Sequence, residues 1–139
     1  HGIDIRTITL HCGVASLERG ERPQPEWFSV PGETVDAVSN AKRNGRRVVA
    51  SGTSVVRALE SAAPSGELAA TSGWTDLIVT REQPPRVVDA LLSGLHQPDA
   101  SHVDLLRGLA SDPFLETAYA VAAGAGLRWH EFGDLHLIK

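Results

Sequence analysis

The stretch Arg46–Ser61, RRVVASGTSVVRALES, decides the fold. Val48-Val49-Ala50 is a short apolar, β-branched run typical of a buried strand, and from Ser54 the apolar residues recur at helical spacing. Gly52 between them permits a tight backbone path, and Thr53 and Ser54 are residue types that cap helices. The sequence therefore predicts a strand, a turn and a helix in direct succession.

The start of that helix is the first candidate binding site. A helix that begins just past a strand end points unpaired N–H groups into the adjoining crevice, where anions and polar oxygens are favoured. Open α/β sheets usually bind ligands at this place. Arg57 and Glu60 lie one helical turn apart, so they could pair or share a substrate group. An ordinary capped helix with a surface ion pair explains the same pattern equally well.

The composition indicates one domain. A chain of 139 residues with 42% apolar residues can build a hydrophobic core. No apolar run approaches the roughly 18 residues of a membrane span, and no secretory leader is recognisable, so we expect a soluble, cytoplasmic protein. The single cysteine, Cys12, excludes an internal disulfide and a multi-cysteine metal site, and we expect it to be buried and inert. Because the chain lacks methionine and begins at His1-Gly2, directly before a predicted strand, we expect a piece of a longer polypeptide.

Charge is unevenly distributed. The formal net charge of −4 argues against a typical nucleic-acid-binding domain, which is usually basic. Lys42, Arg43, Arg46 and Arg47 nevertheless form a basic cluster. This cluster is either a surface that faces phosphates or a solvated helix end.

The pattern of apolar residues and of turn residues predicts alternating strands and helices. We expect strands at residues 3–10, 26–30, 47–51, 77–80, 87–92, 127–132 and 135–138, and helices at 33–44, 54–63, 113–123 and from residue 99 onward. The succession 26–30, 33–44 and 47–51 predicts a right-handed βαβ unit. We therefore expect a single α/β domain over residues 1–139, with a mostly parallel or mixed sheet and flanking helices.

Several common catalytic motifs are absent from the sequence. It contains no GxxxxGK[ST] phosphate loop, no GxGxxG turn, no HExxH and no GxSxG elbow. Its six histidines are scattered, without the paired spacing of a zinc site. Polar residues do gather at the ends of the predicted elements, as a pocket would need and as any α/β surface has: His11, Glu26, Thr53, Arg57, Glu60, Asp76, Asp89, His96 and Asp134.

Several motifs follow one another along the whole chain. They are Thr9-Leu10-His11-x-Gly13, Glu26-Trp27-x-x-Val30-Pro31, Gly45-x-Arg47-Val48-Val49-Ala50-x-Gly52-Thr53, Val56-Arg57-x-Leu59-Glu60-Ser61, Gly73-Trp74-Thr75-Asp76, Val87-Val88-Asp89-x-Leu91, His96-x-Pro98, Ala118-Tyr119 and Gly133-Asp134. In their order and spacing, the sequence resembles the S-adenosylmethionine:tRNA ribosyltransferase-isomerase (QueA) family of queuosine biosynthesis. The resemblance implies the C-terminal part of that family's α/β domain, without its inserted β-barrel.

The resemblance also implies an activity. Enzymes of this family are transferases that move the ribosyl group of S-adenosylmethionine onto a 7-aminomethyl-7-deazaguanine base in tRNA, isomerise it, and release adenine and methionine. S-adenosylmethionine would then be a consumed substrate, with no cofactor or metal, and tRNA would be bound through other parts of the family's chain. We expect no turnover from this stretch alone.

Residue roles are carried over from the resemblance. The implied catalytic residues are His11, Asp89 and His96, and the implied substrate-binding residues are Gly52, Thr53, Ser54, Arg57, Glu60 and Asp134. His11 or His96 would move protons, while Arg57 would hold a carboxylate or phosphate.

The sequence departs from the family pattern near His96. The family's TNFHLP segment reads Ser93-Gly94-Leu95-His96-Gln97-Pro98 here, so an asparagine that could bind a purine or a ribose is missing. An alternative reading is therefore a diverged, non-catalytic paralogue that binds a nucleoside or RNA.

Overall fold

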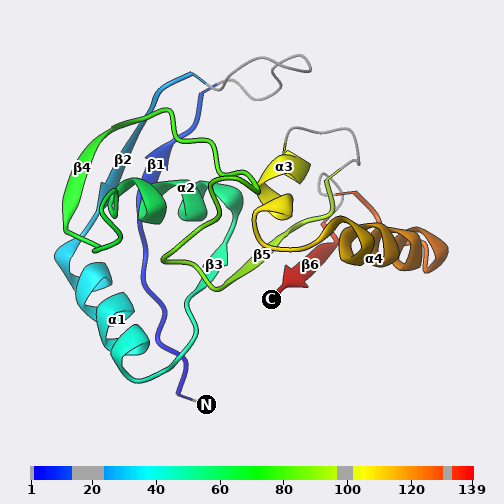
Figure 1. Cartoon of the computed structure of the whole chain (residues 1–139), viewed down its shortest axis with the longest axis horizontal. Helices are drawn as coiled ribbons and strands as arrows, with labels where there is room; N and C mark the ends of the chain where they lie inside the picture. The colour runs from blue at the N-terminus through cyan, green and yellow to red at the C-terminus, as the bar shows by residue number, and fades with distance from the viewer. Residues whose placement is uncertain (1, 14–23, 97–101, 130–132) are drawn as a thin grey trace.

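The computed structural model describes residues 2–13, 24–96, 102–129 and 133–139, which form two three-stranded sheets with flanking helices (Figure 1). The first sheet has the order β1-β2-β4, with β1 (Thr9–His11), β2 (Glu26–Val30) and β4 (Thr71–Thr75) all antiparallel. The second has the order β3-β5-β6, with β3 (Val49–Ser51) parallel to β5 (Ala90–Gly94), and β6 (Leu135–Ile138) antiparallel to β5.

Four helices accompany these sheets in the described part of the chain: α1 (Gly32–Arg43), α2 (Thr53–Ser61), α3 (His102–Arg107) and α4 (Asp112–Gly124). In Figure 1, α1 lies beside the first sheet, while α3 and α4 lie beyond the second. Helix α1 ends as predicted, because Gly45 follows its C-cap with a φ of 64°.

The predicted fold class, α/β with a mixed sheet and flanking helices, is confirmed, but the predicted βαβ unit is wrong. Strand β2 is hydrogen-bonded on both edges, to β1 and to β4, so it leaves no edge for β3. Strand β3 instead joins the second sheet, where its pairing with β5 is the single parallel contact among the described strands. Two small sheets therefore replace the single sheet that the sequence predicted.

Several predicted boundaries are also wrong. The strand predicted at 77–80 lies earlier, at Thr71–Thr75, because backbone pairing with β2 selects that segment over the more apolar Leu77-Ile78-Val79 run. The strand predicted at 3–10 shrinks to Thr9–His11, and residues 127–129 form no strand. The remainder of the strand predicted at 127–132 and the first residues of the helix predicted from 99 lie outside the described residues.

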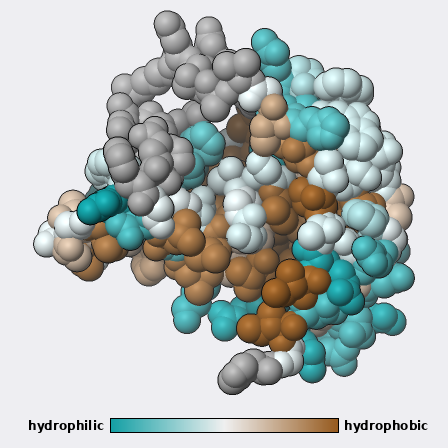
Figure 2. Space-filling view, turned by 180° about the vertical axis from the view of Figure 1, so that it is seen from behind, coloured by the Kyte–Doolittle hydropathy of each residue, from teal (hydrophilic) through white to brown (hydrophobic). Residues whose placement is uncertain are grey.

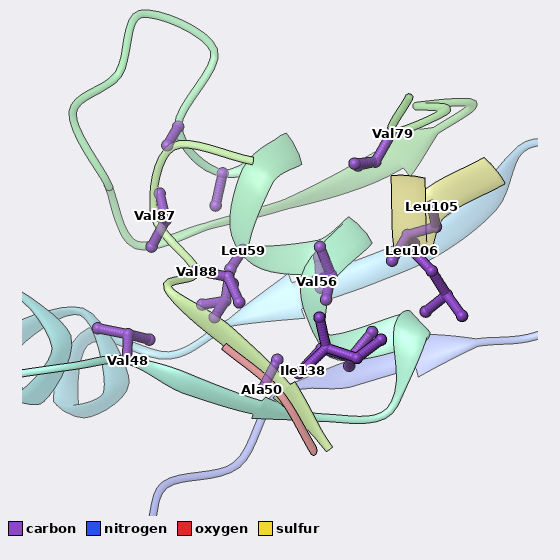
Figure 3. Packing of buried hydrophobic residues seen from close by; sticks show 14 of the residues in the cluster. Val48, Ala50, Val56, Leu59, Val79, Val87, Val88, Leu105, Leu106 and Ile138 are labelled. Carbon is purple, nitrogen blue, oxygen red and sulfur yellow. The ribbon is translucent and has the colours of Figure 1, made fainter. Parts of the chain in front are cut away.

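Helix α2 is the element that both sheets share. Its buried residues Val56, Ala58 and Leu59 belong to a hydrophobic cluster that also includes Phe28 and Val30 of the first sheet and Ala50, Leu91 and Ile138 of the second. Figure 3 shows Val56 and Leu59 on the side of α2 that faces Ala50 and Ile138. Burial of these side chains, each about 1.5 to 3 kcal/mol for a large aliphatic residue, fixes the position of α2.

The turn from β3 into α2 depends on Gly52. Its φ of 96° and ψ of 147° lie in a region that residues with a Cβ rarely adopt. Its N–H donates to the carbonyl oxygen of Leu92 at 2.8 Å, which ties the turn to β5. The predicted tight turn is confirmed, and it places the first residue of α2 directly after the end of β3.

In the described part of the chain, no helix combines the length and the apolar character needed to cross a bilayer.

We expect Gly52→Ala to lower the free energy of unfolding by about 1 to 3 kcal/mol because its φ is unfavourable for alanine. No atom lies within 4 Å of the added Cβ, so steric overlap adds nothing to this cost. Gly13→Ala is the matched control, since that Cβ would also meet no atom within 4 Å and Gly13 has no positive φ. Urea denaturation measures both variants, and equal stabilities would contradict a strained turn at Gly52.

Candidate functional site

The carboxyl ends of β3 and β5 lie at one edge of the second sheet, because the two strands are parallel and Ser51 is opposite Leu92. Helix α2 begins at this edge with Thr53 and Ser54, both half-buried, and its N-cap makes no side-chain hydrogen bond. The first-turn N–H groups therefore point toward this edge without a side-chain cap. We call this region the carboxyl edge.

His96 and Asp134 lie at the carboxyl edge too. His96 is 7% exposed, its Nε2 lies 3.2 Å from the Ser93 Oγ, and its ring stacks on that of His102 with centroids 4.3 Å apart. The carbonyl oxygen of Asp134 accepts the N–H of Leu95 at 3.3 Å. The structure thus places two of the predicted site residues at the same end of the second sheet as the start of α2.

The end of β1 also reaches this edge. Cys12, which the sequence predicted to be buried, is exposed, and its Sγ lies 3.4 Å from the Ser54 Oγ. The prediction is wrong because Cys12 follows an edge strand, where none of the helices and strands in the described part of the chain covers it. The contact shows that the end of β1 lies against the start of α2.

Arg57 does not pair with Glu60, as the helical spacing suggested, but with Glu26 of β2. Both side chains are largely buried, at 14% and 13% exposure. The Arg57 Nε donates to the carbonyl oxygen of Leu77 at 3.1 Å, and the Gly13 N–H donates to the Glu26 Oε1 at 2.9 Å. The Nη2 of Arg57 is buried and has no partner among the described residues, so one charged donor remains for a ligand.

Both carboxylate oxygens of Glu60 accept hydrogen bonds from the backbone. Its Oε1 accepts the N–H groups of Val87 and Val88 at 2.9 and 3.0 Å, and its Oε2 accepts the N–H of Arg86 at 2.9 Å. These bonds attach α2 to the segment that leads into β5. The carboxylate is therefore a structural anchor in this conformation.

Asp89 lies at the opposite end of the second sheet from His96. It directly precedes β5, where its Oδ2 accepts the Val48 N–H at 2.8 Å and its Oδ1 pairs with the Lys42 Nζ at 3.0 Å. The structure therefore does not bring Asp89 to the carboxyl edge, where His96 lies.

His11 lies on the outer face of the first sheet. Its neighbour Leu10 is opposite the buried Phe28, and side chains alternate along a strand, so His11 points away from α2. Its ring lies 5.1 Å from that of Trp27, which is opposite the exposed Trp74 of β4. The three predicted catalytic residues therefore occupy three different places.

A cavity of about 690 Å³ lies beside the C-terminal half of α2 rather than beside its start. The hydroxyls of Ser61 and Thr75 approach within 2.5 Å in its wall, and Trp74, Asp76 and Arg86 also line it. None of the residues from Gly52 to Arg57 lines this cavity. This cavity therefore lies away from the carboxyl edge.

Two polar residues near the carboxyl edge received no site role in the sequence analysis, although Tyr119 belongs to the Ala118-Tyr119 motif. His136 of β6 is opposite Ser93, and Tyr119 of α4 makes an edge-on contact with the His136 ring, with centroids 5.8 Å apart. Burial lowers the pKa of His136 and raises the pKa of Tyr119. Within the described ranges, the His136 Nε2 and the Tyr119 hydroxyl are buried without partners. No motif marks His136, and its place opposite Ser93 follows only from the pairing of β5 with β6.

The fold and the carboxyl edge define a class of protein: a mixed α/β domain that gathers polar groups where parallel strands end, the usual ligand-binding place of such domains. Among the described residues, no group of three side chains could hold a metal ion.

Comparison with known proteins narrows this class. The chain belongs to the queuosine biosynthesis protein family, whose model matches residues 1–138, so the family inferred from the ordered motifs is confirmed. It is similar to the crystal structure of an S-adenosylmethionine tRNA ribosyltransferase from Thermotoga maritima, with 35% sequence identity and a TM-score of 0.75. The match covers 82% of this chain and 40% of that chain, so this chain spans less than half the length of that relative.

We expect Glu60→Gln to lower the free energy of unfolding by about 1 to 3 kcal/mol, because the amide cannot accept all three backbone N–H groups. Glu116→Gln, at an exposed position of α4, is the matched control and should leave stability unchanged. Thermal or urea unfolding measures the stability of both variants. If Glu60→Gln were as stable as the control, the three hydrogen bonds would not anchor the segment before β5.

Proposed function

We propose that this chain forms part of the active site of a QueA-type transferase. The enzyme would move the ribosyl moiety of S-adenosylmethionine onto a 7-aminomethyl-7-deazaguanine base in tRNA, isomerise it, and release adenine and methionine. S-adenosylmethionine would be a consumed substrate rather than a retained cofactor. Family membership and the likeness to the Thermotoga maritima protein support this assignment. The local observation that carries it is the buried Nη2 of Arg57, in the middle of α2, which has no partner among the described residues.

The polar groups of this region suit S-adenosylmethionine. The substrate carries a carboxylate, ribose hydroxyls and a sulfonium, and its conversion needs a base at the acidic carbon beside sulfur and an acid for the departing adenine. We assign the carboxylate to the free Nη2 of Arg57 and the ribose hydroxyls to the first-turn amides of Thr53 and Ser54, while Gly52 shapes the turn that presents them. We assign proton transfer to His96, which lies at the carboxyl edge together with Asp134.

Glu60, Asp89 and His11 receive different assignments. The carboxylates of Glu60 and Asp89 already accept backbone N–H groups, so we assign them to holding the chain around the site. His11 forms an aromatic contact with Trp27 on the outer face of the first sheet. In this proposal, His11 acts only if tRNA is bound across that face.

A non-catalytic nucleoside-binding or RNA-binding paralogue is the second candidate. The observation that favours it is the hydrogen bond between Ser93 and His96, which occupies the imidazole at the segment where the family's asparagine is replaced. Such a protein would bind S-adenosylmethionine or RNA and release no adenine.

The test is adenine release from S-adenosylmethionine by the longest natural polypeptide that contains this sequence, with tRNA carrying the 7-aminomethyl-7-deazaguanine base. We expect tRNA-dependent release, and we expect Arg57→Lys to reduce it on the order of 10-fold, because lysine keeps the charge and loses the fork that grips a carboxylate. Arg107→Lys is the matched control, since Arg107 is an exposed arginine that already pairs with Asp104 and Asp112.

Three outcomes decide between the candidates. Binding of S-adenosylmethionine without adenine release would favour the non-catalytic paralogue. Release that is unaffected by Arg57→Lys would retain the enzyme and reject Arg57 as a substrate-binding residue. If the protein neither binds S-adenosylmethionine nor releases adenine, both candidates are rejected.

A further inference from the structure

Four arginines form an exposed surface at the amino end of the second sheet, which we call the arginine patch: Arg43, Arg46, Arg47 and Arg86. Arg43 is the last residue of α1, Arg46 and Arg47 lead into β3, and Arg86 precedes β5. Figure 2 shows hydrophilic residues at the lower right of the rear face, on the side where Figure 1 places α1. The patch therefore belongs to the solvent-exposed surface of this chain.

The segments that carry the patch are fixed to each other. The Lys42 Nζ donates to the carbonyl oxygen of Arg86 at 3.2 Å and pairs with the Asp89 Oδ1 at 3.0 Å. Asp89 in turn accepts the Val48 N–H through its other oxygen at 2.8 Å. Lys42 is thus neutralised locally, and its contacts hold the end of α1, the start of β3 and the segment before β5 together.

The charges of the patch itself are not neutralised. Within the described ranges, no carboxylate lies within ion-pair distance of these four guanidinium groups. By contrast, Arg81 and Arg107 both pair with Asp112. Favourable interaction with the α1 dipole accounts for Arg43 at the helix end, but Arg46, Arg47 and Arg86 lie outside any helix. A solvated helix end therefore explains one of the four charges.

We propose that the arginine patch docks the phosphate backbone of the tRNA substrate, an inference that rests on the proposed function. Guanidinium groups bind phosphates bidentately and retain their charge at any physiological pH. A concentration of unpaired positive charge in a chain whose net charge is −4 is complementary to a polyanion, and the acidic remainder repels it elsewhere.

The location of the patch fits this role. Arg47 and Gly52, on either side of β3, are five residue steps apart, about 16 Å at the usual strand rise, and this distance separates the patch from the carboxyl edge. Successive phosphates of one nucleic-acid strand lie roughly 3.4 Å apart along the axis of a duplex, so about five phosphates cover the same distance. One RNA stem-loop can therefore present a nucleotide at the carboxyl edge and phosphates at the patch. Such contacts position the RNA and carry no base specificity.

The experiment measures binding of an unmodified tRNA transcript to the intact natural polypeptide at several salt concentrations. The test variant is the double substitution Arg46→Gln and Arg47→Gln, with the single substitution Arg43→Gln as a second variant. The matched control is Arg81→Gln with Arg107→Gln, two exposed arginines that are already paired with carboxylates. Thermal melts identify any variant that does not fold.

We expect the double patch variant to bind the transcript on the order of 10-fold more weakly, and the slope of log affinity against log salt to fall by about 2, one for each lost phosphate contact. Arg43→Gln should lower the slope by about 1. The control variant should bind the transcript with the affinity and the salt slope of the unsubstituted protein. Equal affinity and equal slope in the patch variants would overturn the proposal.

Steady-state kinetics separate this proposal from the proposed function. If the enzyme is active, the patch variant should raise the KM for tRNA and leave the KM for S-adenosylmethionine unchanged; an unchanged KM for tRNA would reject the patch and leave the proposed function intact. If no adenine is released but transcript binding still depends on the patch, the proposed function fails while the patch remains an RNA-docking surface.

Discussion

The ion pair between Arg57 and Glu26 is the contact on which the arrangement of this chain depends. It joins the middle of α2 to the start of β2, and the same two side chains also bond to Gly13, after β1, and to Leu77, after β4. Both charges are largely buried, so removing either one alone would leave an uncompensated charge, at a cost of several kcal/mol. Because α2 also packs on the second sheet, this contact places the two sheets relative to each other.

The second sheet has two ends that differ in chemistry. At the carboxyl edge, the uncapped start of α2 lies near His96 and Asp134, which suits a polar small molecule. At the amino end, the contacts of Asp89 and Lys42 hold together the segments that carry the arginine patch. Short parallel strands separate the two ends. A small substrate at the carboxyl edge and a polyanion at the amino end would therefore not compete with each other.

Local patterns predicted much of the fold. Strand β2 was predicted at its observed bounds and α1 within about a residue, since turn residues and caps mark their ends in the sequence. Sheet membership could not be predicted, because β2 and β3 differ in their distant pairing partners and not in local pattern. The partner of Arg57 was missed for the same reason: Glu60 is close in sequence, whereas Glu26 lies 31 positions away. Its place at the start of a predicted strand put Glu26 among the candidate residues, but the family resemblance gave it no role.

A double-mutant cycle on Arg57 and Glu26 tests this account most directly. The free energy of unfolding is measured for the unsubstituted chain, for Glu26→Gln, for Arg57→Met and for the double variant, so that the coupling between the two side chains is isolated. The account predicts a favourable coupling of about 1 to 3 kcal/mol, as for side chains that share one buried network. A coupling below about 0.5 kcal/mol, the value typical of independent sites, would show that the pair does not join α2 to the first sheet.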